Sequence, residues 1–163
     1  MDDKGDNIPR VIYRSRRPDY ISETIGVGAT GWVGRLRSDP TRVLKYCNKQ
    51  RKHAVQQLEQ EKRIYAIIGH HPLIAHMHAS SEEGIYFEYY PLGSLRGFYE
   101  PRSSLPELGH CLHWCQQSIT AFKYLHLKYI IHGDISARNI LLSSSMDIRA
   151  EMSLSRVVVR FRA

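Results

Sequence analysis

The stretch Ile130-Ile131-His132-Gly133-Asp134-Ile135-Ser136-Ala137-Arg138-Asn139-Ile140-Leu141-Leu142 sets a polar loop between two short apolar runs. The loop holds an aspartate and, five residues later, an asparagine, in the pattern H-x-D-x-x-x-x-N. A loop aspartate can accept the proton of a hydroxyl group or orient that group, and an amide oxygen can ligate a hard cation such as magnesium. Asp134 and Asn139 are therefore the first candidates for chemistry.

A glycine-rich segment, Gly26-Val27-Gly28-Ala29-Thr30-Gly31-Trp32-Val33, lies far upstream of this loop. It matches G-x-G-x-x-G-x-V, but a second strand and a turn follow it, whereas a dinucleotide-binding unit needs a helix at that point. Glycines in such a hairpin let the backbone approach phosphates closely. The alternative on this motif alone is a plain hairpin turn without a ligand.

A lysine and a glutamate sixteen residues apart form the third element. The spacing of Val55, Leu58, Tyr65 and Ile68 predicts an amphipathic helix over 49–68, and Glu61 falls on its apolar stripe. A carboxylate there needs a cation, since an unpaired buried charge is costly. We expect the partner to be Lys45, at the end of the preceding strand. The alternative is that Lys45 and Glu61 do not pair, with the lysine reaching solvent from the strand end and the glutamate in contact with solvent.

The remaining pattern is β-rich first and helical afterwards. Strands are expected within 21–46, over 73–79 and over 84–90, followed by a linker over 89–93 and a short helix from Ser94. A long amphipathic helix is expected over 106–128. Its predicted buried face consists of Leu108, Cys111, Leu112, Cys115, Ile119, Phe122 and Leu125.

Length and composition indicate an ordinary globular chain of 163 residues, 42% hydrophobic and 24% charged. No apolar run approaches the roughly 18 residues of a membrane span, and the acidic start lacks the apolar region of a secretory signal. With three cysteines and no such signal, we expect an intracellular, cytoplasmic protein without a membrane partner. We expect Cys111 and Cys115 to be buried thiols, rather than part of a metal cluster over 110–115.

The net charge of +7 raises nucleic acid as a partner. The basic residues fall in separate groups at 14–17, 49–52 and 156–162, and no nucleic-acid-binding motif accompanies them. We therefore expect solvated basic surfaces and no nucleic-acid partner, with binding of DNA or RNA as a third option.

Taken in order, the glycine loop, the Lys45–Glu61 pair and the loop ending at Asn139 resemble the eukaryotic protein kinase family over about 120 residues. The resemblance implies an α+β fold: an arm over 1–20, a β-rich N-lobe with one helix over 21–92, and a partial, truncated helical lobe over 93–163. It also implies ATP, Mg²⁺ and a protein substrate, while the oligomeric state stays open.

The resemblance implies a role for each matching residue. Asp134 would be the catalytic base, Arg138 would stand beside it, Lys45 would contact phosphates and pair with Glu61, and Asn139 would ligate magnesium. Phe87 would be the gatekeeper of a hinge in which Glu88 and Tyr90 offer backbone hydrogen bonds to adenine. The other implied nucleotide contacts are Gly26, Val27, Gly28, Gly31, Val33 and Val43.

The sequence departs from the family pattern at several points. Gly133 replaces the arginine of H-R-D, and Ser136 replaces a common lysine, which leaves the substrate hydroxyl class open. No D-F-G follows Asn139: Asp147 comes too early, Ala150-Glu151-Met152-Ser153 occupies its place, and the basic end at 156–162 has no counterpart in the family.

We therefore expect a kinase domain cut short, with some nucleotide affinity and little or no phosphoryl transfer. Such a chain would leave apolar surface exposed on its long helix. Two alternatives stay open. One is a pseudokinase that acts as an interaction module. The other is a relative of the aminoglycoside and choline phosphotransferases, which the His132-Gly133-Asp134 loop also resembles.

Overall fold

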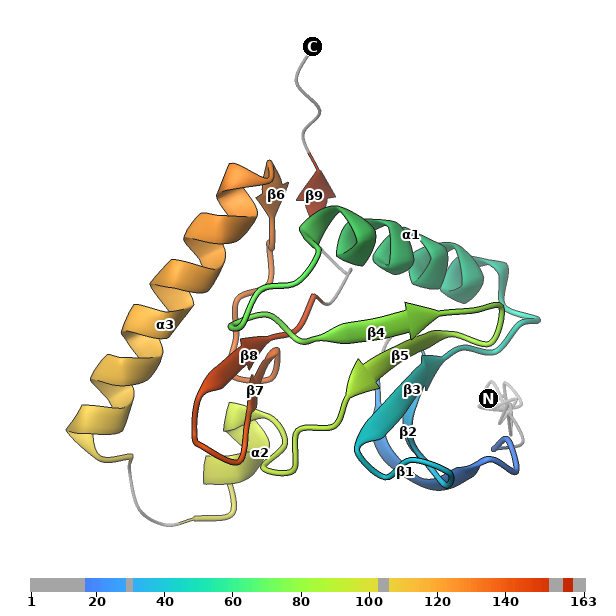
Figure 1. Ribbon diagram of the computed structural model, residues 1–163, viewed down its shortest axis with the longest axis horizontal. Coiled ribbons are helices and arrows are strands. Elements are labelled where there is room, and N and C mark those ends of the chain that lie inside the picture. Colours follow the sequence, from blue (N-terminus) through green and yellow to red (C-terminus); the bar gives the residue numbers. More distant parts are fainter. Residues whose placement is uncertain (1–16, 29–30, 103–105, 153–156, 160–163) are drawn as a thin grey trace, which may run out of the picture.

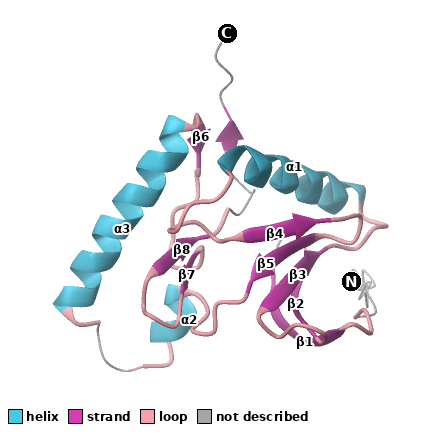
Figure 2. Ribbon diagram, in the orientation of Figure 1, coloured by secondary structure: helices cyan, strands magenta, loops and turns pink. Residues whose placement is uncertain are grey.

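A computed structural model of the chain describes residues 17–28, 31–102, 106–152 and 157–159. Its N-terminal part is a five-stranded antiparallel sheet with strand order β1-β2-β3-β5-β4, and one helix, α1, lies across it (Figures 1 and 2). This confirms the predicted α+β fold with a β-rich N-lobe. The elements are β1 (Ile21–Val27), β2 (Trp32–Leu36), β3 (Arg42–Tyr46), α1 (Lys52–Ile68), β4 (Met77–Ser80), β5 (Ile85–Glu88), α2 (Leu95–Tyr99), α3 (Leu108–Leu127), β6 (Ile130–Ile131), β7 (Ile140–Leu142), β8 (Ile148–Ala150) and β9 (Val158–Val159).

The register of the sheet decides which side chains face α1. Val43 pairs with Phe87 and Lys45 pairs with Ile85, so these four side chains share one face. Leu44, between the two β3 positions, points to the other face and joins a small cluster with neighbouring strands. Lys45 is thus turned inward by the same alternation that buries Val43.

Helix α1 has the buried face that the sequence predicts except at Val55, which is only half-buried. Leu58, Glu61, Tyr65 and Ile68 are all buried. The helix begins at Lys52 rather than at 49, because the chain over 48–51 forms a turn in which Arg51 N–H donates to the carbonyl of Asn48 at 3.0 Å.

The predicted strand over 73–79 is wrong in its first half. Regular pairing with β5 begins only at Met77, and Leu73 and Ala75 instead hydrogen-bond to Ala150 of β8. This short parallel contact joins the N-lobe to the chain beyond Asn139. The predicted strand over 84–90 is shorter, as β5. The short helix expected from Ser94 is α2, which begins at Leu95, and Ser94 caps it by accepting a hydrogen bond from Gly97 N–H at 3.1 Å.

Helix α3 presents a different face to the core from the one predicted. Trp114, Ala121 and Leu125 are buried. Most of the predicted stripe instead faces solvent: the exposed fractions are 73% for Leu108, 57% for Leu112 and 68% for Ile119. Only Phe122 and Leu125, at its C-terminal end, pack against the core, as predicted.

Trp114 accounts for this orientation of α3. Its indole N–H donates to the carbonyl of Met146 at 2.7 Å, and its ring packs with Ile140, Leu142 and Ile148. A buried indole with a satisfied N–H is a large apolar contribution to packing at this position of the helix. The prediction of buried thiols is therefore wrong: Cys115 is exposed and Cys111 only half-buried, and both are unpaired, as is Cys47.

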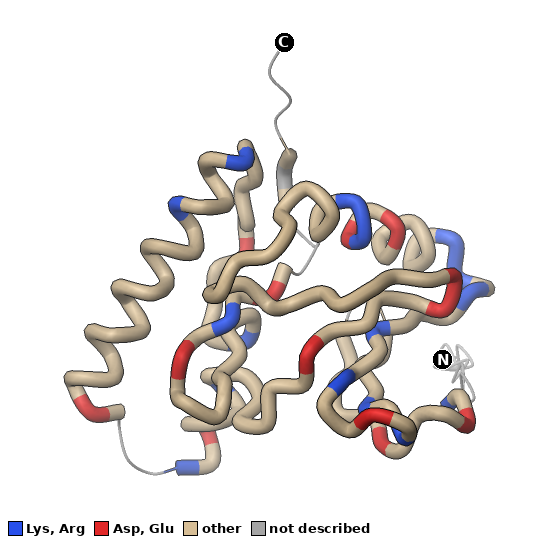
Figure 3. The backbone as a smooth tube through the Cα atoms, viewed as in Figure 1, with Lys and Arg blue, Asp and Glu red and all other residues tan. Residues whose placement is uncertain are grey.

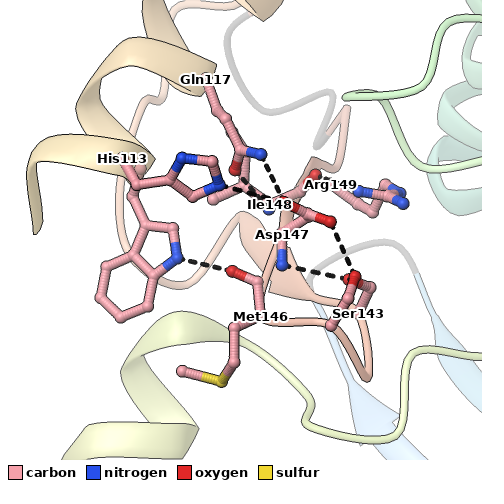
Figure 4. A network of polar contacts seen from close by, with 9 residues as sticks. His113, Gln117, Ser143, Met146, Asp147, Ile148 and Arg149 are labelled. Carbon is pink, nitrogen blue, oxygen red and sulfur yellow. Dashed lines mark hydrogen bonds and ion pairs between the residues drawn. The ribbon is translucent and has the colours of Figure 1, made fainter. Parts of the chain in front are cut away.

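A polar network fixes the β7–β8 hairpin to α3 (Figure 4). The carboxylate of Asp147 accepts hydrogen bonds from Gln117 at 2.6 Å and Ser145 at 2.7 Å, and pairs with His113 at 3.1 Å. These hydrogen bonds lower the pKa of Asp147 to about 2. Gln117 also accepts from Ile148 N–H, so the hairpin is held through both backbone and side chain.

In the basic C-terminal end, Val158 and Val159 pair with Ile131 and Ile130 as β9 and β6, and Val157 is buried in the core. The arginines of this end, the N-terminal arm up to residue 16 and Ser153 lie outside the described residues. In the described part of the chain, Lys and Arg positions are intermixed with Asp and Glu positions along α1 and the sheet (Figure 3). None of the described helices is long and apolar enough to cross a bilayer.

Candidate functional site

A cleft of about 690 Å³ lies between the glycine hairpin, the inner face of the sheet and the loop after β6. This volume falls in the usual range of small-molecule sites. Every predicted site residue except Glu61 lines the cleft. These are Gly26, Val27, Gly28, Gly31, Val33, Val43, Lys45, Phe87, Glu88, Tyr90, Asp134, Arg138 and Asn139.

Gly28 and Gly31 of the hairpin differ in whether packing requires a glycine at their position. A Cβ added to Gly31 would lie 2.0 Å from the carbonyl oxygen of Tyr46, so this position needs glycine for packing against β3. A Cβ added to Gly28 would meet no atom within 4 Å, and Gly28 lies on the wall of the cleft. Packing alone thus explains Gly31 but not Gly28.

Lys45 and Glu61 form the predicted ion pair. The ammonium Nζ lies 2.7 Å from Glu61 Oε1, and both side chains are buried. Burial lowers the pKa of Lys45, but the carboxylates around it outweigh burial and leave that pKa raised. Burial raises the pKa of Glu61 to about 7, against the opposing effect of Lys45.

A second carboxylate, which the sequence analysis did not assign to the site, also contacts Lys45. Glu151 Oε1 lies 3.3 Å from Lys45 Nζ, and the glutamate lines the cleft, whereas Glu61 does not. Glu151 stands where the family pattern places D-F-G, and that position was the only signal in the sequence that pointed to it. Ala75 and Leu141 add apolar wall to the cleft, and no motif in the sequence pointed to them.

The loop after β6 is organised by Asn139 and His132. The amide nitrogen of Asn139 donates to the backbone oxygen of Asp134 at 2.8 Å and to its Oδ2 at 2.9 Å. The amide oxygen of Asn139 and the carboxylates of Asp134 and Glu151 are the hard oxygen type that magnesium prefers, and all three residues line the cleft. Within the described residues, no three acidic, histidine or cysteine side chains form a ready-made metal cluster, so the match to the cation that the fold implies is one of donor chemistry.

His132 is buried and links this loop to the chain at Glu151. Its Nδ1 accepts from Asp134 N–H at 3.3 Å, so Nε2 is the protonated nitrogen and donates to the Glu151 carbonyl at 2.7 Å. Gly133, next in the chain, has φ +70°, a conformation that favours glycine. Gly133, which stands where the family pattern has the arginine of H-R-D, therefore adopts a left-handed backbone conformation.

The predicted hinge lies along the cleft. Phe87 packs edge-on against Tyr65 of α1, with ring centroids 4.8 Å apart. Glu88 N–H donates to the His76 carbonyl, and the Tyr90 carbonyl accepts from Gly93 N–H. Both Glu88 and Tyr90 line the cleft.

The comparisons with known proteins agree with this arrangement. The model of the protein tyrosine and serine/threonine kinase family matches residues 20–160, so the chain belongs to that family of transferases. It is 29% identical over 168 residues to mitogen-activated protein kinase kinase kinase 1a of Physcomitrium patens, across 94% of this chain. It is 28% identical to serine/threonine-protein kinase PLK4 of Xenopus tropicalis, across 82% of this chain, and 28% identical to serine/threonine-protein kinase 10-A of Xenopus laevis, across 85%. The matched segments span 22%, 15% and 16% of these relatives.

Proposed function

We propose that this chain binds ATP with Mg²⁺ in the cleft and transfers the γ-phosphoryl group to a hydroxyl of a protein substrate, at a low rate because Glu151 stands where the family pattern has the aspartate of D-F-G. The observation that carries the proposal is the meeting of three sequence-distant groups in one cleft: the glycine hairpin, the Lys45–Glu61 pair, and the loop of Asp134 and Asn139. Family membership supports the same reaction class.

The apolar and polar parts of the cleft suit different parts of a nucleotide. Val33, Val43 and Leu141 offer apolar wall for a flat base, and the hinge runs along the same wall. Lys45 and the backbone of the glycine hairpin suit the phosphates, since an ammonium held by a buried carboxylate keeps its position and charge.

In the proposed reaction, Asp134 accepts a proton from the substrate hydroxyl while the phosphoryl group is transferred to that oxygen. The substrate oxygen attacks the γ-phosphorus, the bond from that phosphorus to the β-bridging oxygen breaks, the hydroxyl proton passes to Asp134, and ADP leaves. Asn139 holds Asp134 in place through its amide N–H groups. Magnesium, when bound, neutralises charge on the phosphates, and Asn139 is the residue we assign to hold it.

Phosphoryl transfer from labelled ATP to a mixture of serine, threonine and tyrosine peptides tests the proposal. We expect Asp134→Asn to lower the rate by about 10²-fold or more. Asp19→Asn, which removes an exposed carboxylate outside the cleft, should leave the rate unchanged. Equal rates for Asp134→Asn and the wild type would refute the role of Asp134.

A pseudokinase that binds nucleotide without transfer is the second candidate. The observation that favours it is the contact between Glu151 and Lys45, which places a carboxylate on the lysine that would meet the phosphates. Saturable ATP binding with no labelled product would select this candidate. We place either activity inside the cell, since three unpaired cysteines suit a reducing compartment.

A further inference from the structure

Helix α3 carries an apolar stripe on its outer side. The stripe consists of Leu108, Leu112, Cys115 and Ile119, all of which are exposed. α3 lies along one edge of the molecule (Figure 1), and Trp114 on its opposite face packs against the β7–β8 hairpin. Apolar side chains that gather on one exposed face are typical of an interaction surface.

The stripe has the spacing of a seam between two helices. Its four residues are separated by four, three and four positions, which is the alternation of a heptad repeat. Residues with this spacing lie on one side of a helix and interlock with residues of the same spacing on a second helix. Among the 20 residues of α3, Lys123 is the single Lys, Arg, Asp or Glu, so such a contact buries almost no charge. The stripe is therefore suited to a helix that resembles α3 itself.

The charges at the two ends of α3 select the direction of such a pair. The exposed Glu107 precedes the helix, while the exposed Lys123 and Lys128 lie near its end and just beyond it (Figure 3). Two parallel copies would place like charges, and like ends of the two helix dipoles, side by side. An antiparallel copy places the glutamate of each chain beside the lysines of the other. A second α3 therefore complements the first in both spacing and charge.

We propose that two copies of this chain associate through α3, with the two helices antiparallel and the two stripes in contact. The contact is isologous, because a twofold axis relates the copies and each supplies the same residues. A helix of 20 residues is about 30 Å long, so the interface is small and the dimer is weak. No stripe residue lines the cleft, so this pairing does not use the residues of the proposed nucleotide site.

Sedimentation equilibrium of the full chain between about 1 and about 100 µM tests the proposal, since this range suits a weak dimer. We expect the mean mass to rise with concentration from 18.9 kDa toward twice that value. Leu112→Glu, which places a carboxylate in the seam, should weaken association about tenfold or more. Gln60→Glu adds the same charge on the exposed side of α1 and should leave association unchanged.

Charge reversal at low ionic strength tests the antiparallel direction. Glu107→Lys should weaken association about fivefold, because it sets like charges side by side at both ends of the pair. Adding Lys123→Glu to the same chain should restore most of the affinity. A double variant that associates no better than Glu107→Lys alone would overturn the antiparallel pair.

A bis-maleimide cross-linker provides an independent measurement. Cys115 lies in the stripe, so the pair brings two Cys115 thiols close together. We expect cross-linked dimer from the wild type and from Cys47→Ser, but not from Cys115→Ser.

Two results of sedimentation would overturn the proposal. One is a mass that stays at 18.9 kDa over the whole range. Slow labelling of Cys115 by a maleimide would then show that another segment of the same chain covers the stripe, and fast labelling would show that the stripe is uncovered. The other is a mass that rises past two copies and is the same in Leu112→Glu, which would show association through a different surface.

Discussion

Lys45 Nζ lies 2.7 Å from Glu61 Oε1, and the Glu61 side chain is fully buried. The pair joins β3 to α1 across the inner face of the sheet, so it belongs to both the core and the cleft. Glu61 Oε2 has no hydrogen-bond partner within the described residues, which makes the carboxyl group dependent on its single cation.

We predict that Lys45→Met lowers the free energy of unfolding by about 3 kcal/mol, because it leaves a buried carboxyl group without its cation. Urea denaturation measures the loss. Arg96→Met breaks an exposed pair with Glu100 and should cost less than about 1 kcal/mol. Equal losses for the two variants would show that the buried pair is not a stabilising element.

The observed orientation of α3 predicts opposite effects for two leucines of the same helix. Leu125→Ala should cost about 2–5 kcal/mol, because Leu125 is fully buried and the substitution leaves a cavity. Leu112→Ala should cost about 0.5 kcal/mol or less, because Leu112 faces solvent. Denaturant unfolding of both variants checks this, and a large loss at Leu112 would support the face predicted from the sequence.

From the lowered pKa of Asp147 we predict that its carboxylate stabilises the folded chain and that this contribution is lost in acid. Its pKa is lowered in the folded chain to about 2 from an ordinary value of 3.8. The contribution is therefore present above about pH 4–5 and is lost as the pH falls toward 2. Thermal unfolding of Asp147→Asn should show a shallower decline between pH 5 and pH 2 than the wild type or Glu82→Gln, a variant at an exposed turn. A parallel decline in all three would contradict this.

The backbone at Gly133 predicts an order of substitutions. Gly133→Ala should destabilise the chain by about 1 kcal/mol, since a residue with a Cβ is strained at φ +70°. Gly133→Asn should cost less, because asparagine tolerates this conformation better. Melting temperatures compare the two, and greater stability of the alanine variant would contradict the assigned strain.

The sequence predicted those parts of the site that local pattern determines. Glu61 on an apolar stripe required a cation, and the strand alternation at Val43 turned Lys45 toward it. Two features of the structure could not be predicted from local sequence pattern. Glu151 reaches Lys45 because β8 pairs with the chain at Ile74, a contact between segments 76 residues apart along the chain. The face of α3 depended on Trp114 and its hydrogen bond to Met146, since both faces of this helix carry apolar residues.

Equilibrium titration of MgATP against the folded chain tests the central claim most directly. The account predicts saturable binding at one site, at least about tenfold weaker in Lys45→Met, because the ammonium that meets the phosphates is gone. Lys128→Met, which removes a lysine at the far end of α3, should bind like the wild type. Absence of saturable binding, or equal affinity of wild type and Lys45→Met, would contradict the assignment of this cleft as the ATP site.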